Sequence, residues 1–234
     1  MGAEARVSWN RFAGQAELAE AVADAVAQRL QAAIGARGAA FMAVSGGTTP
    51  APFFRALSGR PLAWDKVTVT LVDERFVPMS SPRSNAALVA DDLLQGPAAT
   101  ARFVGLYHPA ASAEAGAGLA SQALAGLGWP LDIAVLGMGQ DGHTASFFPD
   151  ATDLPTLLDP QSQALVLPVE AASAGEPRLT LALPRIAGAG FVALHIEGET
   201  KRKVAEAALA PGSRLPIRAV IDHALRPVEI FWAP

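Results

Sequence analysis

The sequence predicts an α/β fold in which helices cover both faces of a mostly parallel β-sheet. Short apolar runs, suited to strands buried on both faces, alternate with longer amphipathic segments suited to helices. Two of the apolar runs open directly into glycine-rich polar turns, which suits the carboxyl ends of parallel strands. Hydrophobic residues make up 51% of the 234 residues, which is enough for one full core, so we expect a single domain over residues 1–234.

The first half of the chain alternates between predicted helices and strands. Leu18, Val22 and Val26 recur at helical spacing, and Gly35 is a plausible stop for that helix. Thr49 and Pro50 suit the N-cap and the first turn of the next helix. The predicted elements are a helix over 15–34, a strand over 39–44, a helix from 50 to about 57, a strand over 67–72 and a helix from about 85 to 94.

The second half continues the alternation with more irregular connections. Several prolines and aspartates predict a loop over 149–162. The predicted elements are a helix over 112–127, strands over 131–136, 164–169, 179–183 and 191–196, a helix from 198 to about 209 and a closing strand over 228–232.

Composition and charge exclude several classes of protein. The formal net charge of −4 and the scattered aromatic residues argue against nucleic acid as a partner. The chain has no cysteine, which excludes disulfides and thiol nucleophiles. The N-terminus lacks the pattern of a signal peptide, and no apolar run reaches the roughly 20 residues of a membrane span. We therefore expect a globular protein of the cytoplasm with no membrane partner.

The first glycine-rich turn, at residues 45–50, has two interpretations. A strand, a glycine-rich turn and a helix N-terminus together offer backbone N–H groups and a favourable dipole to an anion. The hydroxyls of Ser45, Thr48 and Thr49 support anion binding, because phosphates accept hydrogen bonds from them. However, Gly46 and Gly47 could equally form only a tight turn.

The second glycine-rich turn follows the strand at 131–136 and carries Asp141 and His143. His143 is the residue of this turn whose ordinary pKa suits proton transfer near neutral pH, so it is the candidate general base. His195 lies inside an apolar strand, where a structural histidine with satisfied hydrogen bonds is the expected interpretation. Asp-x-His alone is weak evidence for a metal site.

Charged residues near other predicted strand ends complete the candidate site. Residues 73–75, Asp-Glu-Arg, follow a strand and form either a solvated ion pair or part of a ligand-binding edge. Arg178 and Lys201 are either ordinary surface cations or the groups that neutralise a phosphate at the first turn.

Taken together, these motifs resemble the 6-phosphogluconolactonase family, whose relatives are the glucosamine-6-phosphate deaminases/isomerases. They occur in the family's order from residue 45 to residue 201. The matching motifs are Ser45-Gly46-Gly47-Thr48-Thr49-Pro50, Asp73-Glu74-Arg75 with Val77-Pro78, Ser84-Asn85, residues 136–146 with Phe148-Pro149, Pro177-Arg178-Leu179-Thr180, and Gly198 with Lys201.

The resemblance implies a Rossmann-like three-layer α/β sandwich that hydrolyses 6-phospho-D-glucono-1,5-lactone to 6-phospho-D-gluconate in the oxidative pentose phosphate pathway. It implies no metal and no organic cofactor. We also expect a monomer or a homodimer. Carried over by position, His143 would be the base, with Asp73, Arg75 and Asp141 as the other catalytic candidates. Substrate-binding positions would be Ser45, Gly46, Gly47, Thr48, Asn85, Gly137, Arg178 and Lys201.

The chemistry is consistent with this assignment and leaves some partners open. Neutral His143 would take a proton from the attacking water and return it to the departing ring oxygen. Arg75 or loop N–H groups could stabilise the charge on the carbonyl oxygen. Either Asp73 or Asp141 could orient the imidazole.

Two alternative functions remain. A deaminase/isomerase would have an Asn-Glu pair before the proline, where this chain has Phe147 and Phe148. A phenyl ring cannot relay a proton, so this difference favours the lactonase. A non-catalytic sugar-phosphate-binding domain would usually carry an effector module, and 234 residues leave no room for one.

Overall fold

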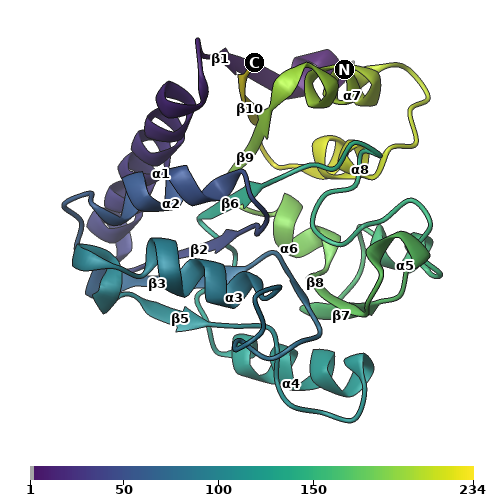
Figure 1. Cartoon of the computed structure of the whole chain (residues 1–234), viewed down its shortest axis with the longest axis horizontal. Helices are drawn as coiled ribbons and strands as arrows, with labels where there is room; N and C mark the ends of the chain where they lie inside the picture. The colour runs from purple at the N-terminus through teal and green to yellow at the C-terminus, as the bar shows by residue number, and fades with distance from the viewer. Residues whose placement is uncertain (1–2) are drawn as a thin grey trace.

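The computed structural model describes residues 3–234, which form two β-sheets with helices around the larger one (Figure 1). The larger sheet has seven strands in the order β1-β10-β9-β6-β2-β3-β5, and every neighbouring pair is parallel. The predicted mostly parallel sheet is confirmed. Its strands are β1 (Val7–Arg11), β2 (Ala40–Val44), β3 (Val67–Leu71), β5 (Arg102–Val104), β6 (Ile133–Leu136), β9 (Phe191–Glu197) and β10 (Val228–Ala233).

The helices gather on both sides of this sheet. α1 and α2 pack against each other on one side, and α7 and α8 pack against each other on the other side (Figure 1). Within the described residues, no helix is both long enough and apolar enough to span a membrane. The α-helices are α1 (Gln15–Arg37), α2 (Pro50–Ser58), α3 (Asn85–Leu88), α4 (Ala113–Ala125), α5 (Leu154–Leu157), α6 (Leu183–Ala187), α7 (Gly198–Leu209) and α8 (Pro216–His223). A π-helical turn, η3 (Val89–Leu93), continues α3, and 3-10 turns are η1 (Ala3–Arg6), η2 (Trp64–Lys66), η4 (Gly96–Thr100) and η5 (Ala172–Ala174).

The expected stop of the first helix at Gly35 is wrong. α1 runs through Gly35 and ends at Arg37, where Gly38 adopts a left-handed φ of 76° and donates its N–H to the carbonyl of Ile34. A glycine inside a helix costs only about 1 kcal/mol relative to alanine, whereas a left-handed cap strongly favours glycine. The second glycine therefore ends the helix.

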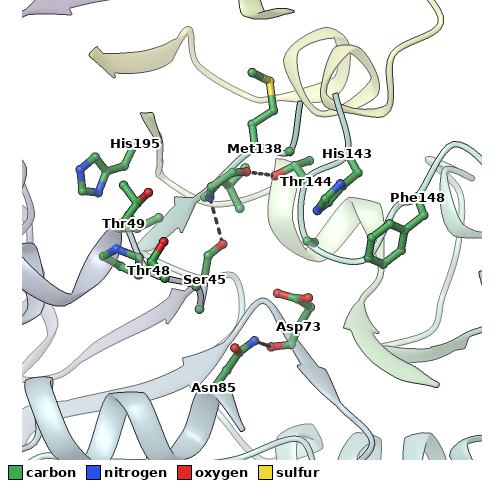
Figure 2. A pocket seen from close by; sticks show the side chains of 18 of the residues that line it. Ser45, Thr48, Thr49, Asp73, Asn85, Met138, His143, Thr144, Phe148 and His195 are labelled. Atoms are coloured by element: carbon green, nitrogen blue, oxygen red, sulfur yellow. Dashed lines mark hydrogen bonds between the residues drawn. The ribbon is translucent and has the colours of Figure 1, made fainter. Parts of the chain in front are cut away.

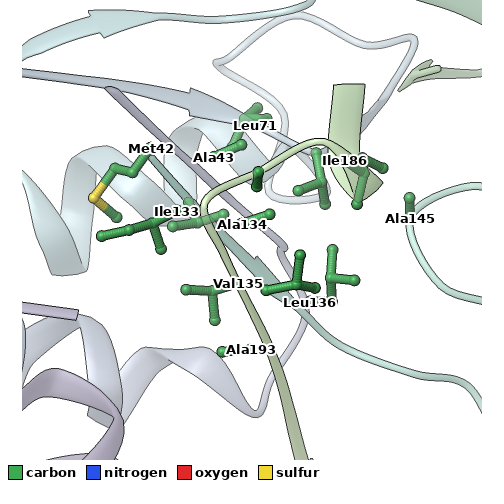
Figure 3. Close-up of a cluster of buried hydrophobic side chains, with 14 of the residues drawn as sticks. Met42, Ala43, Leu71, Ile133, Ala134, Val135, Leu136, Ala145, Ile186 and Ala193 are labelled. Atoms are coloured by element: carbon green, nitrogen blue, oxygen red, sulfur yellow. The ribbon is translucent and has the colours of Figure 1, made fainter. Parts of the chain in front are cut away.

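The two central strands, β2 and β6, carry the middle of the core. Every residue of both strands is buried, as expected for a parallel strand covered on both faces. Met42 from β2 lies beside Ile133 of β6, and Val135 and Leu136 continue the cluster (Figure 3). This packing holds both strand ends in fixed positions.

The order of the strands places a topological switch point between β2 and β6. From β2 the chain moves outward to β3 and β5, whereas from β6 it moves in the other direction to β9 and β10. The turns after β2 and β6 therefore leave the same edge of the sheet side by side, which is where open α/β sheets bind ligands.

A small antiparallel sheet, which the sequence did not predict, lies beside this edge. It has the order β4-β8-β7, with β4 (Asp73–Arg75), β8 (Arg178–Leu181) and β7 (Val166–Val169). Arg75 pairs with Arg178 in this register. Two predicted strands thus exist but belong to the second sheet, and the charged segment 73–75 is itself a strand.

Several short elements were also missed. β1 and β5 are short strands at the two edges of the large sheet, α5 lies in the segment predicted as a loop, and α6 and α8 each begin with a proline in the first turn. Such segments are too short for hydrophobic periodicity to identify them.

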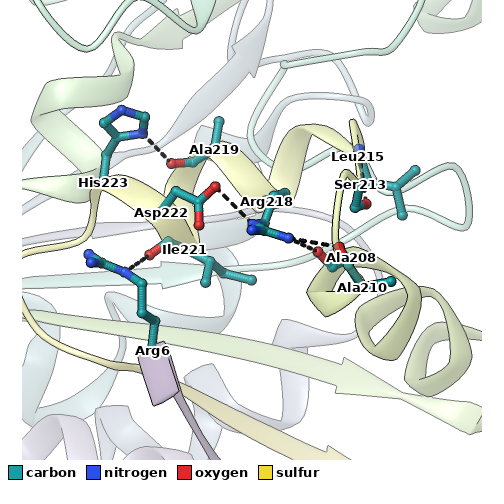
Figure 4. Close-up of polar contacts among 10 residues, drawn as sticks. All are labelled: Arg6, Ala208, Ala210, Ser213, Leu215, Arg218, Ala219, Ile221, Asp222 and His223. Atoms are coloured by element: carbon teal, nitrogen blue, oxygen red, sulfur yellow. Dashed lines mark hydrogen bonds and ion pairs between the residues drawn. The ribbon is translucent and has the colours of Figure 1, made fainter. Parts of the chain in front are cut away.

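The missed helix α8 supports the turn after β6. The guanidinium of Arg218 donates to the carbonyls of Ala208 and Ala210 at the end of α7, and Arg6 donates to the carbonyl of Ile221 (Figure 4). The N–H of Ile217 donates to the carbonyl of Gly142 at 3.0 Å. α8 is therefore anchored on one side and holds the histidine-bearing turn on the other.

Candidate active site

A cavity of about 470 Å³ opens at the switch point, between the turns that follow β2 and β6 (Figure 2). The predicted site residues that line it are Ser45, Gly46, Gly47, Thr48, Asp73, Arg75, Asn85, Gly137, His143, Arg178 and Lys201. Asp141 is the predicted site residue outside this lining. The chain thus brings together in space residues that are up to 156 positions apart, from 45 to 201.

Ser45 ties the two glycine-rich turns together. Its backbone N–H donates to the carbonyl of Val135 at 2.9 Å, and its hydroxyl oxygen accepts the N–H of Gly137 at 3.1 Å (Figure 2). Thr144 donates its hydroxyl to the carbonyl of Gly137 at 2.7 Å. These contacts fix the floor of the cavity, so Ser45 has a structural function besides any contact with a ligand.

The turn after β2 leads straight into the N-terminus of α2. Thr49 occupies the predicted N-cap position, but its hydroxyl makes no capping hydrogen bond, and its backbone is already helical. Gly47 has a φ of 100°, which favours glycine. With Thr48 exposed to the cavity, this turn offers backbone N–H groups and a hydroxyl to an anion.

Gly46 is required by a close approach of the Asn85 side chain. A Cβ atom at Gly46 would lie 1.8 Å from Asn85 Oδ1. Asn85 donates its amide to the carbonyl of Asp73 at 2.9 Å and accepts a hydrogen bond from the guanidinium of Arg75 at 2.7 Å. Asn85 therefore positions the acid and the cation of β4 against the first turn.

The segment 73–75 is a buried part of the site and not a solvated ion pair. Asp73 is 7% exposed and accepts a hydrogen bond from the Ser146 hydroxyl at 2.6 Å. Glu74 is fully buried and accepts hydrogen bonds from the N–H groups of Arg75, Asn85 and Ala86 and from the Ser84 hydroxyl. Burial raises the pKa of Glu74, and these hydrogen bonds oppose that shift. Glu74 thus joins β4 to the start of α3.

His143 is paired with Asp141. The imidazole Nδ1 lies 2.6 Å from Asp141 Oδ1, and the same oxygen accepts the backbone N–H of His143 at 3.1 Å. Of the two acids that could orient the imidazole, Asp141 makes this contact, whereas Asp73 is bonded to Ser146. A carboxylate on Nδ1 fixes the tautomer that leaves Nε2 available as a base.

The backbone around His143 is shaped for this pair. A Cβ atom at Gly139 would lie 2.3 Å from the imidazole and 2.5 Å from Asp141 Oδ1. Ala145 adopts a left-handed φ of 49°, which is strained for a residue with a side chain. The ring of Phe148 lies 4.4 Å from the imidazole, centroid to centroid, and forms an apolar wall beside it.

The two predicted phosphate-binding cations lie in different surroundings. The Arg178 guanidinium lies 5.6 Å from the ring of Phe148, on the side of His143. Burial lowers the pKa of Arg178, and the charge of Asp73 opposes that shift. Burial also lowers the pKa of Lys201, but there the opposing charge is Glu197. Arg178 therefore lies on the His143 side of the cavity, whereas Lys201 lies beside Glu197.

His195 is the residue that the sequence interpretation misjudged. It is 3% exposed, as expected for a strand interior, but it also lines the cavity. Within the described residues, its Nε2 has no hydrogen-bond partner, and Glu197 Oε1 is 3.9 Å away. It is not a satisfied structural histidine. The apolar residues around His195 in the sequence predict only a core position. Only the tertiary structure shows that His195 also lines the cavity.

Comparisons with known proteins agree with the motifs. A family model described as glucosamine-6-phosphate isomerases/6-phosphogluconolactonase matches residues 13–232. A 6-phosphogluconolactonase of Mesorhizobium japonicum is 65% identical over 230 residues, covering 98% of this chain and 97% of that protein. A 6-phosphogluconolactonase of Rhizobium meliloti is 56% identical, covering 95% of this chain and 97% of that protein.

Solved structures of the same family superimpose on this chain over nearly its whole length. The crystal structure of a 6-phosphogluconolactonase from Shewanella baltica superimposes with a TM-score of 0.94 at 38% identity, covering 97% of this chain and 98% of that one. A monomeric glucosamine-6-phosphate deaminase superimposes with a TM-score of 0.77 at 19% identity, covering 97% of each chain. The second comparison shows a shared fold alone.

Proposed function

This chain belongs to the glucosamine-6-phosphate isomerase/6-phosphogluconolactonase family, and we propose that His143 is the general base with which it hydrolyses 6-phosphogluconolactone. The observation that carries the proposal is the Asp141–His143 pair beside the cavity at the switch point. The expectation of lactone hydrolysis from the motifs is confirmed by the relatives, and the residue assignments stay predictions.

The proposed reaction uses two proton transfers at one imidazole nitrogen. His143 Nε2 takes a proton from water as the water oxygen attacks the lactone carbonyl carbon. The tetrahedral intermediate then collapses, the bond from that carbon to the ring oxygen breaks, and the imidazolium returns the proton to the departing oxygen. Asp141 stabilises the imidazolium through Nδ1. Such general base catalysis contributes typically about 10²–10⁴-fold.

Arg75 and Arg178 are the proposed stabilisers of the developing negative charge. They are opposite each other on neighbouring strands of the small sheet, and both line the cavity. Within the described residues, the Nε of each guanidinium is buried without a hydrogen-bond partner. Preorganised donors that meet the charge of the intermediate lower the barrier because they need no reorganisation during the reaction.

The phosphate of the substrate is proposed to bind at the turn of residues 45–48 and Lys201. The turn supplies backbone N–H groups at the start of α2, and Lys201 supplies a positive charge. Because the phosphate is remote from the lactone carbon, its binding fixes the orientation of the ring against His143.

For the deaminase/isomerase alternative, this chain lacks a proton-transferring side chain in the two positions before Pro149. Phe147 is fully buried in the core and Phe148 packs on the imidazole, so both residues before Pro149 are apolar walls. This observation favours hydrolysis, which needs only one base. The single-domain organisation, the cytoplasmic location and the monomeric or dimeric state stay predictions.

The experiment that tests the proposal compares the wild type with His143→Ala on freshly prepared 6-phosphogluconolactone. We expect the wild type to hydrolyse the lactone well above the buffer rate, and the variant to lose about 10²–10⁴-fold in kcat. Binding of the product 6-phosphogluconate, measured by calorimetry, should be nearly unchanged. Full turnover by His143→Ala would place the base elsewhere.

A further inference from the structure

His195 is deeply buried, lines the cavity and makes no hydrogen bond through its ring Nε2 within the described residues. Its side chain is 3% exposed, yet within residues 3–234 its Nε2 has no hydrogen-bond partner. Buried polar groups are nearly always hydrogen-bonded, so an imidazole in a cavity wall that makes no hydrogen bond to the described residues points to a partner that arrives with a ligand. The proposed catalytic steps do not use this imidazole.

The surroundings of His195 hold the ring rigidly and keep it neutral. The ring of Phe53 packs against it edge to face at 6.0 Å. The charged groups that face it are Glu197 on the same strand and Lys201 on α7. Burial is the main cause that lowers the pKa of His195 to about 4, and the positive charge of Lys201 is the second cause. The neutral ring therefore carries one N–H, and no bond within the described residues fixes which nitrogen bears it.

His195 lies at the end of the cavity where the phosphate of the substrate is proposed to bind. Figure 2 shows its imidazole beside Thr49 and Thr48, with Ser45 between this group and His143. The lactone carbon must lie at His143, so the phosphate, at the opposite end of the sugar, extends toward Thr48, Lys201 and His195.

We propose that His195 is a further specificity-determining residue, which donates a ring N–H to a phosphate oxygen of the substrate alongside Lys201. This inference rests on the proposed function, in which the substrate is a phosphorylated lactone. A neutral donor adds a hydrogen bond to the phosphate without placing a second buried cation beside Lys201 before the ligand binds. The site then favours phosphorylated over unphosphorylated lactones.

The test measures steady-state kinetics on 6-phosphogluconolactone and on glucono-1,5-lactone. His195→Phe keeps a ring against Phe53 and removes the donor, whereas His195→Gln keeps an N–H donor. We expect His195→Phe to raise the KM for the phosphorylated lactone about 10- to 100-fold, the contribution of one hydrogen bond to a charged group. Its kcat, and its kcat/KM for the unphosphorylated lactone, should change little, and His195→Gln should recover part of the loss.

The matched control is His223→Phe, because His223 is exposed on α8 and bonds only to the carbonyl of Ala219 among the described residues. An unchanged KM in His195→Phe, or an equal loss on both lactones, would overturn the inference. Binding of inorganic phosphate, measured by calorimetry, gives a readout that needs no turnover. It should weaken in His195→Phe relative to the wild type, and equal affinities would contradict the inference.

The two proposals fail in distinguishable ways. If the wild type does not hydrolyse the lactone, the proposed function is wrong, and the phosphate titration still decides whether His195 binds an anion. If His195→Phe proves unstable, the folded His195→Gln variant and a second variant, Lys201→Met, allow the same comparison. Lys201→Met with a normal phosphate affinity would place the anion elsewhere and so contradict the inference.

Discussion

At the scale of single residues, the site depends on pairs that local sequence only partly reveals. Asp141 and His143 are two positions apart, so their contact is local, and the turn supplies both the acid and the proposed base. Asp73, the other acid considered, is held by Ser146, which is 73 positions away in the chain. The choice between the two acids therefore needed the tertiary structure.

Asp141→Asn should lower kcat by roughly 100-fold or more, because an amide facing Nδ1 no longer stabilises the imidazolium and can favour the wrong tautomer. KM should change little, since Asp141 does not line the cavity. Steady-state kinetics check both values. Asp65→Asn is the control, because Asp65 is exposed and pairs only with Lys66 among the described residues. A kcat equal to that of the wild type would show that the acid does not orient His143.

The burial of His195 predicts a dependence of stability on pH. Its pKa falls from 6.5 in the unfolded chain to about 4 in the folded protein. Between these two values the unfolded state binds more protons, so the free energy of unfolding should decrease as the pH falls from 6.5 toward 4, by on the order of a few kcal/mol. Urea unfolding of the wild type and of His195→Phe over this range measures the effect. Parallel curves for the two proteins would contradict it.

At the scale of elements, two glycine-rich turns and the missed helix α8 build the site. Gly46 makes room for Asn85, and Gly139 makes room for the Asp141–His143 pair. A Cβ atom at Gly142 would lie 2.9 Å from Leu215, just before α8. Gly46, Gly139 and Gly142 are therefore needed because other side chains approach them closely.

Gly139→Ala should reduce kcat by about 10-fold or more while the protein stays folded, because the added methyl displaces the imidazole from its reacting position. Kinetics and thermal unfolding provide the measurements. The matched control is Gly118→Ala in α4, where an added Cβ meets nothing within 4 Å. That change should leave activity intact and stabilise the protein by about 0.5–1 kcal/mol. Equal kcat values for both variants would argue against the close-packing explanation.

Glu74→Ala should destabilise the protein by about 3 kcal/mol or more. The carboxylate is fully buried and accepts four hydrogen bonds, three of which join β4 to the start of α3, and its removal leaves the four donors unpaired. Urea unfolding gives the free energy of unfolding. Glu199→Ala is the comparison, because Glu199 is exposed on α7 and its ion pair with Arg202 should contribute about 1 kcal/mol or less. A small loss for Glu74→Ala would mean that the cluster contributes little to stability.

At the scale of the whole molecule, the strand order sets the location of the cavity. The switch point between β2 and β6 brings both glycine-rich turns to one edge, and the small antiparallel sheet adds Asp73, Arg75 and Arg178 to the cavity. The family model spans residues 13–232, so the fold is shared over nearly the whole chain. A similar fold also serves a deaminase, so the fold alone does not determine the reaction.

The wild type should therefore hydrolyse 6-phosphogluconolactone but release no ammonia from glucosamine 6-phosphate. The reason is that the two residues before Pro149 are Phe147 and Phe148, whose phenyl rings cannot transfer the proton that opening of a sugar ring requires. Parallel assays of acid release from the lactone and of ammonia release from the amino sugar make the comparison. Comparable turnover of both substrates would show that another group performs ring opening.

The sequence by itself determined the α/β class, most central strands and helices, and the two glycine-rich turns that border the cavity. Hydrophobic periodicity and turn chemistry are local properties, so they identify β2, β6 and α7 from short windows. The combined motifs also identified the family, because their order along the chain is specific. The edge strands and the proline-led helices α6 and α8 were missed because they are short and stabilised mainly by their neighbours.

Only the tertiary structure decided how the side chains of these elements meet. It paired Asp141 with His143, buried the segment 73–75 in a second sheet, and brought Arg178, Lys201 and His195 to one cavity. Except for the Asp141–His143 pair, these outcomes depend on contacts between segments far apart in the chain. Such contacts are set by strand order and packing, which a local reading of the sequence does not contain.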